Sequence, residues 1–176
     1  TDLSLIPEVF SVLSQHGQVP LQGKKFLEIG TGDLRNALGA AAEGMEVTAI
    51  EKDPAIFMGE TYRIFEAAKK DERTKDLVSK IQILNADALS EEVRSHWEKA
   101  DIVFFYYTEP KGAAERQKFL HRFQIQLSRL RPGSILVLLL FGSYSATDEN
   151  TENLKDFLGM SGFRNPQITR LLTVVR

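Results

Sequence analysis

Two glycines separated by a single residue, Gly30 and Gly32, have acidic residues nearby and form the part of this sequence best suited to chemistry. The segment Phe26–Glu51 has the pattern of a strand, a turn at Gly30 and Gly32, a helix, and a second strand ending in Glu51. A side chain at either glycine would keep a ligand away from the turn and from the start of the helix. An acid about 20 residues beyond such a turn can accept hydrogen bonds from both hydroxyls of a ribose. The segment therefore predicts a site for a nucleotide-type ligand.

Another acidic residue, Asp87, follows a later predicted strand within Asn85-Ala-Asp87-Ala88. In that loop its carboxylate can accept a hydrogen bond from the exocyclic amine of an adenine ring. Three residues would form the walls around the ring: Ile50, Lys52 and Ala88. Each feature also has a purely structural interpretation, because two glycines can simply form a tight turn and an aspartate can stabilise one. Their joint placement favours the ligand site.

Glu28 precedes the two glycines and lies in a strand that we expect to be buried. A buried carboxylate costs free energy unless it is paired or faces a polar site. Glu28 is therefore either part of the ligand site or held by a structural partner.

Strand patterns alternate with helical patterns along the chain, and this alternation predicts the scaffold of the site. We expect strands over residues 25–29, 47–51, 80–84, 101–107 and 134–141, helices over 3–14, 36–43, 53–69, 90–98, 113–130 and 151–160, and one strand or a tight pair over 163–175. Repeated strand–helix units imply an α/β, three-layer, doubly wound and mostly parallel sheet with helices on both faces. Ligands of such sheets bind outside the carboxyl ends of the strands. We expect one domain, residues 1–176, in which residues 1–23 form a helix and a loop that cover the core.

Three local signals refine these boundaries. Asp53-Pro54 predicts the start of a helix, because aspartate is a good N-cap and proline suits the first helical position. Ser90 predicts a helix start with a capping box. The charged stretch Lys69–Lys75 predicts a solvated connection.

The composition excludes several kinds of site. The 176 residues include no cysteine, which excludes disulfides, thiolate metal ligands and cysteine nucleophiles. The absence of cysteine fits a reducing compartment, so we expect a cytoplasmic protein. The three histidines lack the paired spacing of a metal site, so no metal is predicted: His16, His96 and His121.

The charge and hydropathy of the chain indicate the kind of partner. A net charge of -2 gives no general basic field, which disfavours nucleic acid and favours a small molecule or a protein. No basic leader followed by an apolar core opens the sequence, and the longest apolar run, Ile135–Phe141, is far too short to cross a bilayer. We expect a soluble protein without a membrane partner. Nothing in the sequence indicates its oligomeric state.

The turn also discriminates between nucleotide cofactors. A dinucleotide-binding fold has a third glycine three residues after the second, and Arg35 stands there, which disfavours NAD. Phe26-Leu-Glu-Ile-Gly-Thr-Gly32 instead resembles the first motif of the class I S-adenosylmethionine-dependent methyltransferases. The resemblance covers nearly the whole chain from Lys25 onward and includes residues 85–88, 101–110 and 130–133. It implies a Rossmann-like fold and S-adenosyl-L-methionine as the cofactor.

The resemblance also implies roles for individual residues. Glu28 would orient the methionyl amino group, and the Gly30-Thr31-Gly32 turn would admit the cofactor. Glu51 would hold the ribose, and Asp87 the adenine. Members of the family often have a further glycine two residues after the turn. This chain has Leu34 there, which we expect to narrow the space near the methionine portion of the cofactor.

Three candidates for catalysis lie at or just after the carboxyl end of the fourth predicted strand: Tyr106, Tyr107 and Glu109. Methyl transfer from a sulfonium is an in-line displacement, so the enzyme mainly aligns the reactants and supplies a base where the nucleophile carries a proton. An aromatic ring can face the sulfonium, and a carboxylate can take the proton. Residues 104–107 also alternate along a buried strand, so at least half of them belong to the core.

The segment Tyr107-Thr-Glu109-Pro110 bears on the methyl acceptor. It does not match the Asn/Asp-Pro-Pro-aromatic motif of enzymes that methylate amino groups of nucleic acid bases. Residues 101–110 together with Gly32-Asp-Leu-Arg35 are loosely similar to small protein-lysine methyltransferases. The resemblance therefore implies a protein side chain, such as lysine, or a small molecule as the acceptor. The alternative is a non-catalytic module that binds the cofactor or a partner, which Leu34 and the small size favour.

Overall fold

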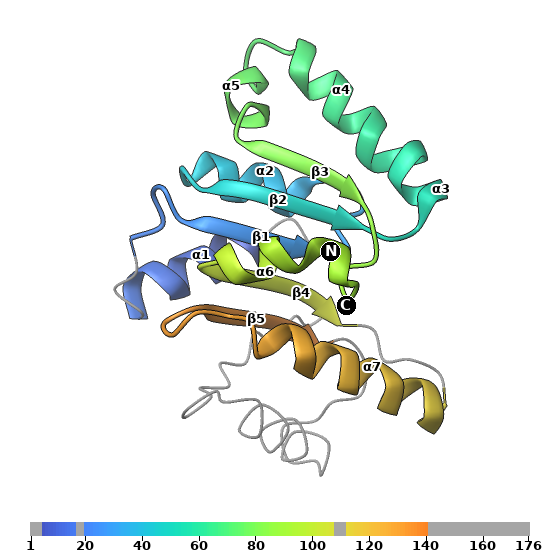
Figure 1. The fold of residues 1–176 in the computed structure, drawn as a ribbon. Helices are drawn as coiled ribbons and strands as arrows, with labels where there is room; N and C mark the ends of the chain where they lie inside the picture. Colours follow the sequence, from blue (N-terminus) through green and yellow to red (C-terminus); the bar gives the residue numbers. More distant parts are fainter. Residues whose placement is uncertain (1–4, 17–19, 108–111, 141–176) are drawn as a thin grey trace, which may run out of the picture.

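The computed structural model describes residues 5–16, 20–107 and 112–140, which form a sheet between two layers of helices (Figure 1). Within these residues the sheet has five parallel strands in the order β3-β2-β1-β4-β5. The strands are β1 (Lys25–Ile29), β2 (Glu46–Glu51), β3 (Ile81–Asn85), β4 (Ile102–Tyr107) and β5 (Ile135–Leu140). The order reverses between β1 and β4, so the two halves of the sheet wind away from β1 in opposite directions. The expected doubly wound α/β fold is confirmed.

One face of the sheet is covered by α1 (Leu5–His16), α2 (Arg35–Ala42) and the helices that follow β2. In α1, Val9 and Phe10 are buried, and the Phe10 ring meets the ring of Phe26 edge-on with 5.8 Å between centroids. In α2, Ala37 and Ala40 have no exposed surface. Such small side chains let the helix backbone lie close to the strands.

The opposite face is covered by α6 (Arg94–Lys99) and α7 (Ala113–Leu127). Trp97 of α6 is fully buried, and its indole N–H donates to the carbonyl oxygen of Ala88 at 2.8 Å. The Trp97 ring also meets Phe123 of α7 edge-on, with 6.1 Å between centroids. A buried indole with its N–H satisfied contributes apolar contact without an unpaired donor. This contact fixes α6 and α7 against the same part of the sheet.

A continuous helix follows β2 and begins at the strand's carboxyl end. It consists of α3 (Pro54–Ile56), a π-helical segment (Phe57–Thr61) and α4 (Tyr62–Lys70). The side chain of Asp53 accepts hydrogen bonds from the backbone amides of Ala55 and Ile56, at 2.8 and 3.3 Å. The predicted N-cap is therefore confirmed.

The charged stretch Lys69–Lys75 is not wholly a solvated connection. The helix α4 continues to Lys70, and a short helix, α5 (Lys75–Val78), begins at the last residue of the stretch. Val78 is 3% exposed and Leu77 packs against the core beside α2, so apolar burial anchors this turn of helix. The expected solvated connection is therefore confirmed for residues 71–74, which form turns between the two helices, and only the ends of the charged stretch are helical.

Ser90 does not act as the predicted cap. A short 3₁₀ turn (Glu91–Val93) precedes α6, and the Ser90 hydroxyl makes no capping bond. Its Oγ is buried with no partner among the described residues. The third residue after Ser90 is the buried Val93 rather than a glutamate or glutamine, so the reciprocal half of a capping box is missing.

Leu34 precedes α2 in the left-handed backbone region, with φ 63° and ψ 6°. Its side chain is 1% exposed and belongs to the apolar core that includes Phe26 and Phe104. The expectation that Leu34 narrows the cofactor site is therefore wrong, because its side chain packs inside the apolar core. A non-glycine residue in this backbone region costs about 1–2 kcal/mol, which the buried leucine offsets.

We expect Leu34→Gly to be more stable than Leu34→Ala by about 1 kcal/mol, because both variants lose the side chain but only alanine keeps the backbone strain. Both should be less stable than the wild type, by roughly 2–5 kcal/mol for the alanine variant. Urea unfolding measures the difference. The control is Ala37→Gly inside α2, where glycine should destabilise. An alanine variant at position 34 as stable as the glycine variant would contradict the strain argument.

Candidate functional site

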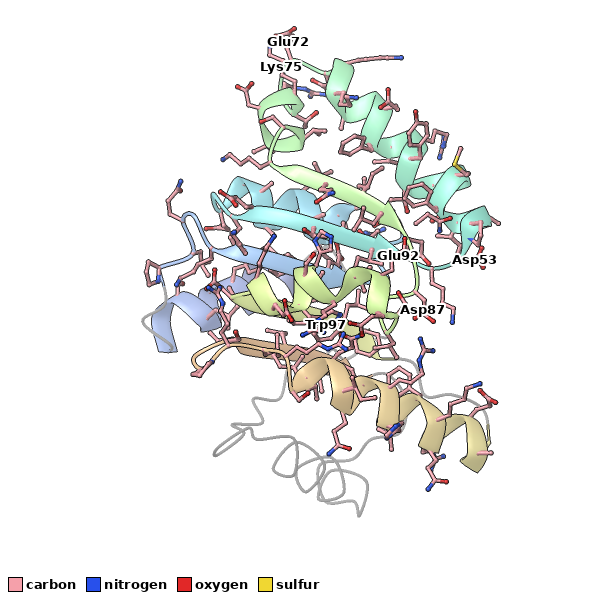
Figure 2. All side chains as sticks on the ribbon, viewed as in Figure 1. Asp53, Glu72, Lys75, Asp87, Glu92 and Trp97 are labelled. Carbon is pink, nitrogen blue, oxygen red and sulfur yellow. The ribbon has the colours of Figure 1, made fainter. Side chains whose placement is uncertain are left out.

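The carboxyl ends of the parallel strands lie at one edge of the sheet, and the predicted ligand-binding residues gather there. Figure 2 shows Asp53 and Asp87 at this edge, beyond the ends of β2 and β3. The glycine turn follows β1 at the same edge. The topology thus brings together residues that are far apart in sequence, as a doubly wound sheet does at its ligand-binding edge.

The turn after β1 offers open space rather than free amides. The amides of Gly30 and Thr31 both donate to the carbonyl of Ile50, at 2.8 and 3.2 Å. Gly30 and Gly32 have φ of +76° and +52°, in the region that favours glycine. Among the described residues, apart from each glycine and its two chain neighbours, no atom lies within 4 Å of where a Cβ would stand on either. The turn therefore has room for a ligand, while the amides of Gly30 and Thr31 hold the turn itself to β2.

Glu51 joins the end of β2 to this turn. It is 8% exposed, and its Oε2 accepts from the amide of Gly32 at 3.2 Å while its Oε1 accepts from the amide of Asp53 at 3.0 Å. One carboxylate thus fixes both the turn after β1 and the start of the helix after β2. A carboxylate oxygen can accept more than one hydrogen bond, so each keeps acceptor capacity.

Glu28 lies under the turn in a buried polar cluster. Its Oε2 accepts from the Thr31 hydroxyl and its Oε1 from the Asn36 amide, both at 2.7 Å. Burial raises the pKa of Glu28 from its ordinary 4.5 to about 7, and these two hydrogen bonds lower it only in part. The sequence left open whether Glu28 has a structural partner, and the structure provides two. Its role toward a methionyl amino group stays a prediction.

Asp87 lies at the site between two basic side chains. Its Oδ1 accepts from the amide of Leu89 at 3.0 Å, and its Oδ2 lies 2.9 Å from Arg122 Nη2 and 3.3 Å from Lys52 Nζ. Burial would raise the pKa of Asp87, but these hydrogen bonds and ion pairs outweigh it and hold the pKa below its usual range. Asp87 is therefore a charged acceptor whose position α7 helps to fix.

The predicted wall residues differ in their exposure. Ile50 and Ala88 are 1% and 5% exposed and belong to the core on the side of α6 and α7. Lys52 has a mostly exposed side chain that reaches Asp87. Only Lys52 of the three thus presents a large side-chain surface to solvent beside Asp87.

The catalytic candidates are placed only in part. Tyr106 and Tyr107 end β4, where their backbones pair with Leu139 and Leu140 of β5. Glu109 lies outside the described residues. The roles of all three stay predictions.

Three residues of the site were not found from the sequence: Asn36, Thr61 and Arg122. Asn36 donates to Glu28, Thr61 donates from its hydroxyl to the carbonyl of Gly32, and Arg122 pairs with Asp87. The sequence showed Arg122 only as one of several basic residues on a helix. Each contact joins residues from different elements, so no local pattern reveals it.

The residues that the structure describes contain neither a cluster of metal-ligating side chains nor a helix that could span a membrane. No group of three or more histidine, cysteine, aspartate or glutamate side chains there has an arrangement that could hold a metal ion. Among the helices in the same ranges, none is long and apolar enough to cross a membrane.

Solved structures resemble this chain, although sequence comparisons give no relative. No model of a protein family matches the sequence, and no curated protein matches it significantly. A precorrin-6Y C5,15-methyltransferase from Geobacter metallireducens matches with a TM-score of 0.58 and 18% identity, over 89% of this chain and 72% of that one. A putative S-adenosyl-L-methionine-dependent methyltransferase from Methanococcus maripaludis matches with a TM-score of 0.60 and 13% identity, over 91% and 78%. An RNA methyltransferase from Salinibacter ruber, in complex with S-adenosyl-L-homocysteine, matches with a TM-score of 0.51 and 18% identity, over 78% and 79%.

These matches show that the chain has the Rossmann-like fold of class I S-adenosylmethionine-dependent methyltransferases, which confirms the expected fold. Among the first three matches, the chain spans between 52% and 72% of the neighbour's length. Because the neighbours include proteins named as RNA methyltransferases, the comparisons do not support the expectation that nucleic acid is an unlikely partner.

We expect Glu28→Gln to remove one pH-dependent part of the stability. Between about pH 4.5 and 7 the folded protein keeps a proton on Glu28 that the unfolded chain releases, so this residue lowers stability as the pH rises. The full effect is on the order of 3 kcal/mol above pH 7. Urea unfolding of both proteins at pH 5 and pH 8 measures it. From pH 5 to pH 8, the free energy of unfolding of the variant should rise relative to that of the wild type. A difference in stability between the two proteins that is equal at both pH values would refute the raised pKa of Glu28.

Proposed function

We propose that this chain binds S-adenosyl-L-methionine at the carboxyl edge of its sheet and transfers the methyl group to a protein side chain or a small molecule. The observation that carries the proposal is the contact between Glu51 and the glycine turn. A buried carboxylate at the end of β2 holds the amide of Gly32, and open space lies over Gly30 and Gly32. This arrangement suits a ligand with a vicinal diol and an extended arm.

The acceptor capacity of Glu51 supports the ribose assignment. Each of its oxygens accepts one backbone N–H, from Gly32 or from Asp53, and a carboxylate has about four acceptor positions in all. Each oxygen can therefore accept a ribose hydroxyl without losing its protein partner. The two backbone bonds also fix the carboxylate before the ligand arrives, which lowers the entropy cost of binding.

The number of free acceptor positions on its carboxylate also supports Asp87 as the acceptor for the adenine amine. Its Oδ2 has two basic partners, Arg122 and Lys52, whereas its Oδ1 has only the amide of Leu89 among the described residues. The free position on Oδ1 suits the exocyclic amine. The Lys52 side chain lies beside this acceptor, where its alkyl part can cover one side of the ring.

The bound cofactor would supply an electrophilic methyl group on a sulfonium, and the residues of the chain would align it. The glycine turn leaves room for the arm of the cofactor, and Glu28 holds the turn from below through Thr31. Tyr106 and Tyr107 end the strand that pairs with β1, so the acceptor would approach from the β4 side. Glu109 is the proposed base where the nucleophile carries a proton.

The identity of the methyl acceptor rests on the sequence. The fourth-strand segment favours a protein side chain, with lysine as the leading candidate, or a small molecule. The structural neighbours carry names that refer to precorrin and RNA, so their likeness supports methyl transfer without indicating one acceptor. Leu34 had favoured a non-catalytic module, and its burial in the core removes that argument.

Calorimetric titration of the purified protein tests the proposal. We expect S-adenosyl-L-methionine and its demethylated product S-adenosyl-L-homocysteine to bind with micromolar dissociation constants, and NADH not to bind. Incubation with labelled cofactor and a panel of proteins, lysine derivatives and RNA then tests the acceptor. Absence of binding by both the cofactor and its product would end the proposal, and labelling of RNA alone would overturn the acceptor class.

We expect Glu51→Ala to weaken binding of S-adenosyl-L-homocysteine by about 1.5–3 kcal/mol, because the ribose loses charge-assisted hydrogen bonds and the turn loses its anchor. Calorimetry measures the loss. Glu46→Ala is the matched control, since Glu46 is exposed at the other end of the same strand and should leave the affinity unchanged. Equal affinities of the Glu51 variant and the wild type would refute the ribose assignment.

A further inference from the structure

We propose that Thr61 is a positioning residue for the cofactor site, and that its hydroxyl fixes the glycine turn by donating to the carbonyl of Gly32. The effect on the turn follows from the structure alone, whereas the effect on cofactor binding rests on the function proposed above. Thr61 acts through the backbone of Gly32.

Thr61 is unusual for its place in the helix that follows β2. Three large side chains near it are exposed, at 39% for Ile56, 58% for Met58 and 43% for Tyr62, whereas Thr61 has no exposed surface. A buried hydroxyl needs a partner to offset the loss of water. The partner of the Thr61 hydroxyl is Gly32, which lies 29 residues earlier in the chain.

The π-helical segment explains how Thr61 reaches this position. The amide of Tyr62 donates to the carbonyl of Phe57, five residues earlier, so this turn of the helix holds one residue more than an α-helical turn. Thr61 ends the π-helical segment directly before α4, and Ile64 and Phe65 of α4 pack against the core. Single π-helical turns inside α-helices are frequently found at functional sites.

Gly32 needs such support because glycine is the residue with the greatest backbone freedom. Its amide is held by Glu51 from the end of β2, and its carbonyl is held by Thr61 from the helix that follows the same strand. The two side chains thus fix both sides of one residue. No side chain of the described residues beyond its chain neighbours comes within 4 Å of where a Cβ of Gly32 would stand, so these two hydrogen bonds help to set the local path of the chain where the cofactor arm would lie.

Replacing the hydroxyl with a methyl group isolates this role. In Thr61→Val the side chain keeps its shape, but the carbonyl of Gly32 loses its donor, so the turn samples more conformations. Binding of a ligand that needs the ordered turn must then also order the turn, and this entropy cost weakens the affinity. Thr61→Ser retains the hydroxyl, so the order of the turn and the affinity for the ligand should both match those of the wild type.

The test combines amide hydrogen exchange of the ligand-free protein with calorimetric titration of S-adenosyl-L-homocysteine. We expect Thr61→Val to speed exchange at residues 30–34 and to weaken binding about tenfold, the loss of one hydrogen bond to a buried group. Thr61→Ser should restore both. The matched control is Thr74→Val. Thr74 follows the carboxyl end of α4, far from the glycine turn in sequence, and its hydroxyl donates to the carbonyl of Ala68 at 2.8 Å.

The outcomes separate the positioning role from a general loss of stability. Thr74→Val should lower the unfolding midpoint without changing exchange at residues 30–34 or the affinity. Unchanged exchange at the turn in Thr61→Val, or equal changes there in the two valine variants, would overturn the positioning role. A wild-type protein that binds no S-adenosyl-L-homocysteine would overturn the proposed function, and the exchange experiment would still decide the role of Thr61.

Discussion

The site depends on how a flexible residue, Gly32, is held in place. Its amide donates to Glu51 and its carbonyl accepts from Thr61, so the end of β2 and the helix after it define the turn after β1. Removing a side chain creates room but also removes the packing that would fix the backbone. The structure resolves this conflict with polar contacts from two other elements. The open space over the turn is therefore bounded by a fixed backbone.

A second constraint comes from the buried carboxylate of Glu28 beneath the same turn. Its hydrogen bonds to Thr31 and Asn36 tie the turn to the start of α2. The Asn36 Oδ1 is buried with no partner among the described residues, so the cluster is not fully satisfied. Buried polar groups of this kind reduce stability and yet specify one arrangement. Glu28 thus supports the site at a cost to the fold.

Much of the scaffold could be predicted, because its signals are local. β1 has the predicted bounds, and the Asp53 cap makes the predicted bonds, since an apolar run and an Asp-Pro pair act over a few residues. The π-helical segment leaves no comparable signal, and the contacts of Thr61 and Arg122 depend on elements that meet only in the folded chain. Glu51 and Asp87 could be placed at the site because strand ends meet at one edge, but their protein partners could not.

The most direct test of the account is a crystal structure of the protein grown with S-adenosyl-L-homocysteine. The account predicts the ribose hydroxyls on the carboxylate of Glu51, the adenine amine on Asp87, and the homocysteine arm over Gly30 and Gly32, with the backbone of the turn unchanged. A ligand bound elsewhere on the molecule, or a turn that must be rebuilt to admit it, would contradict the central claim that Glu51 and the fixed glycine turn form the cofactor site.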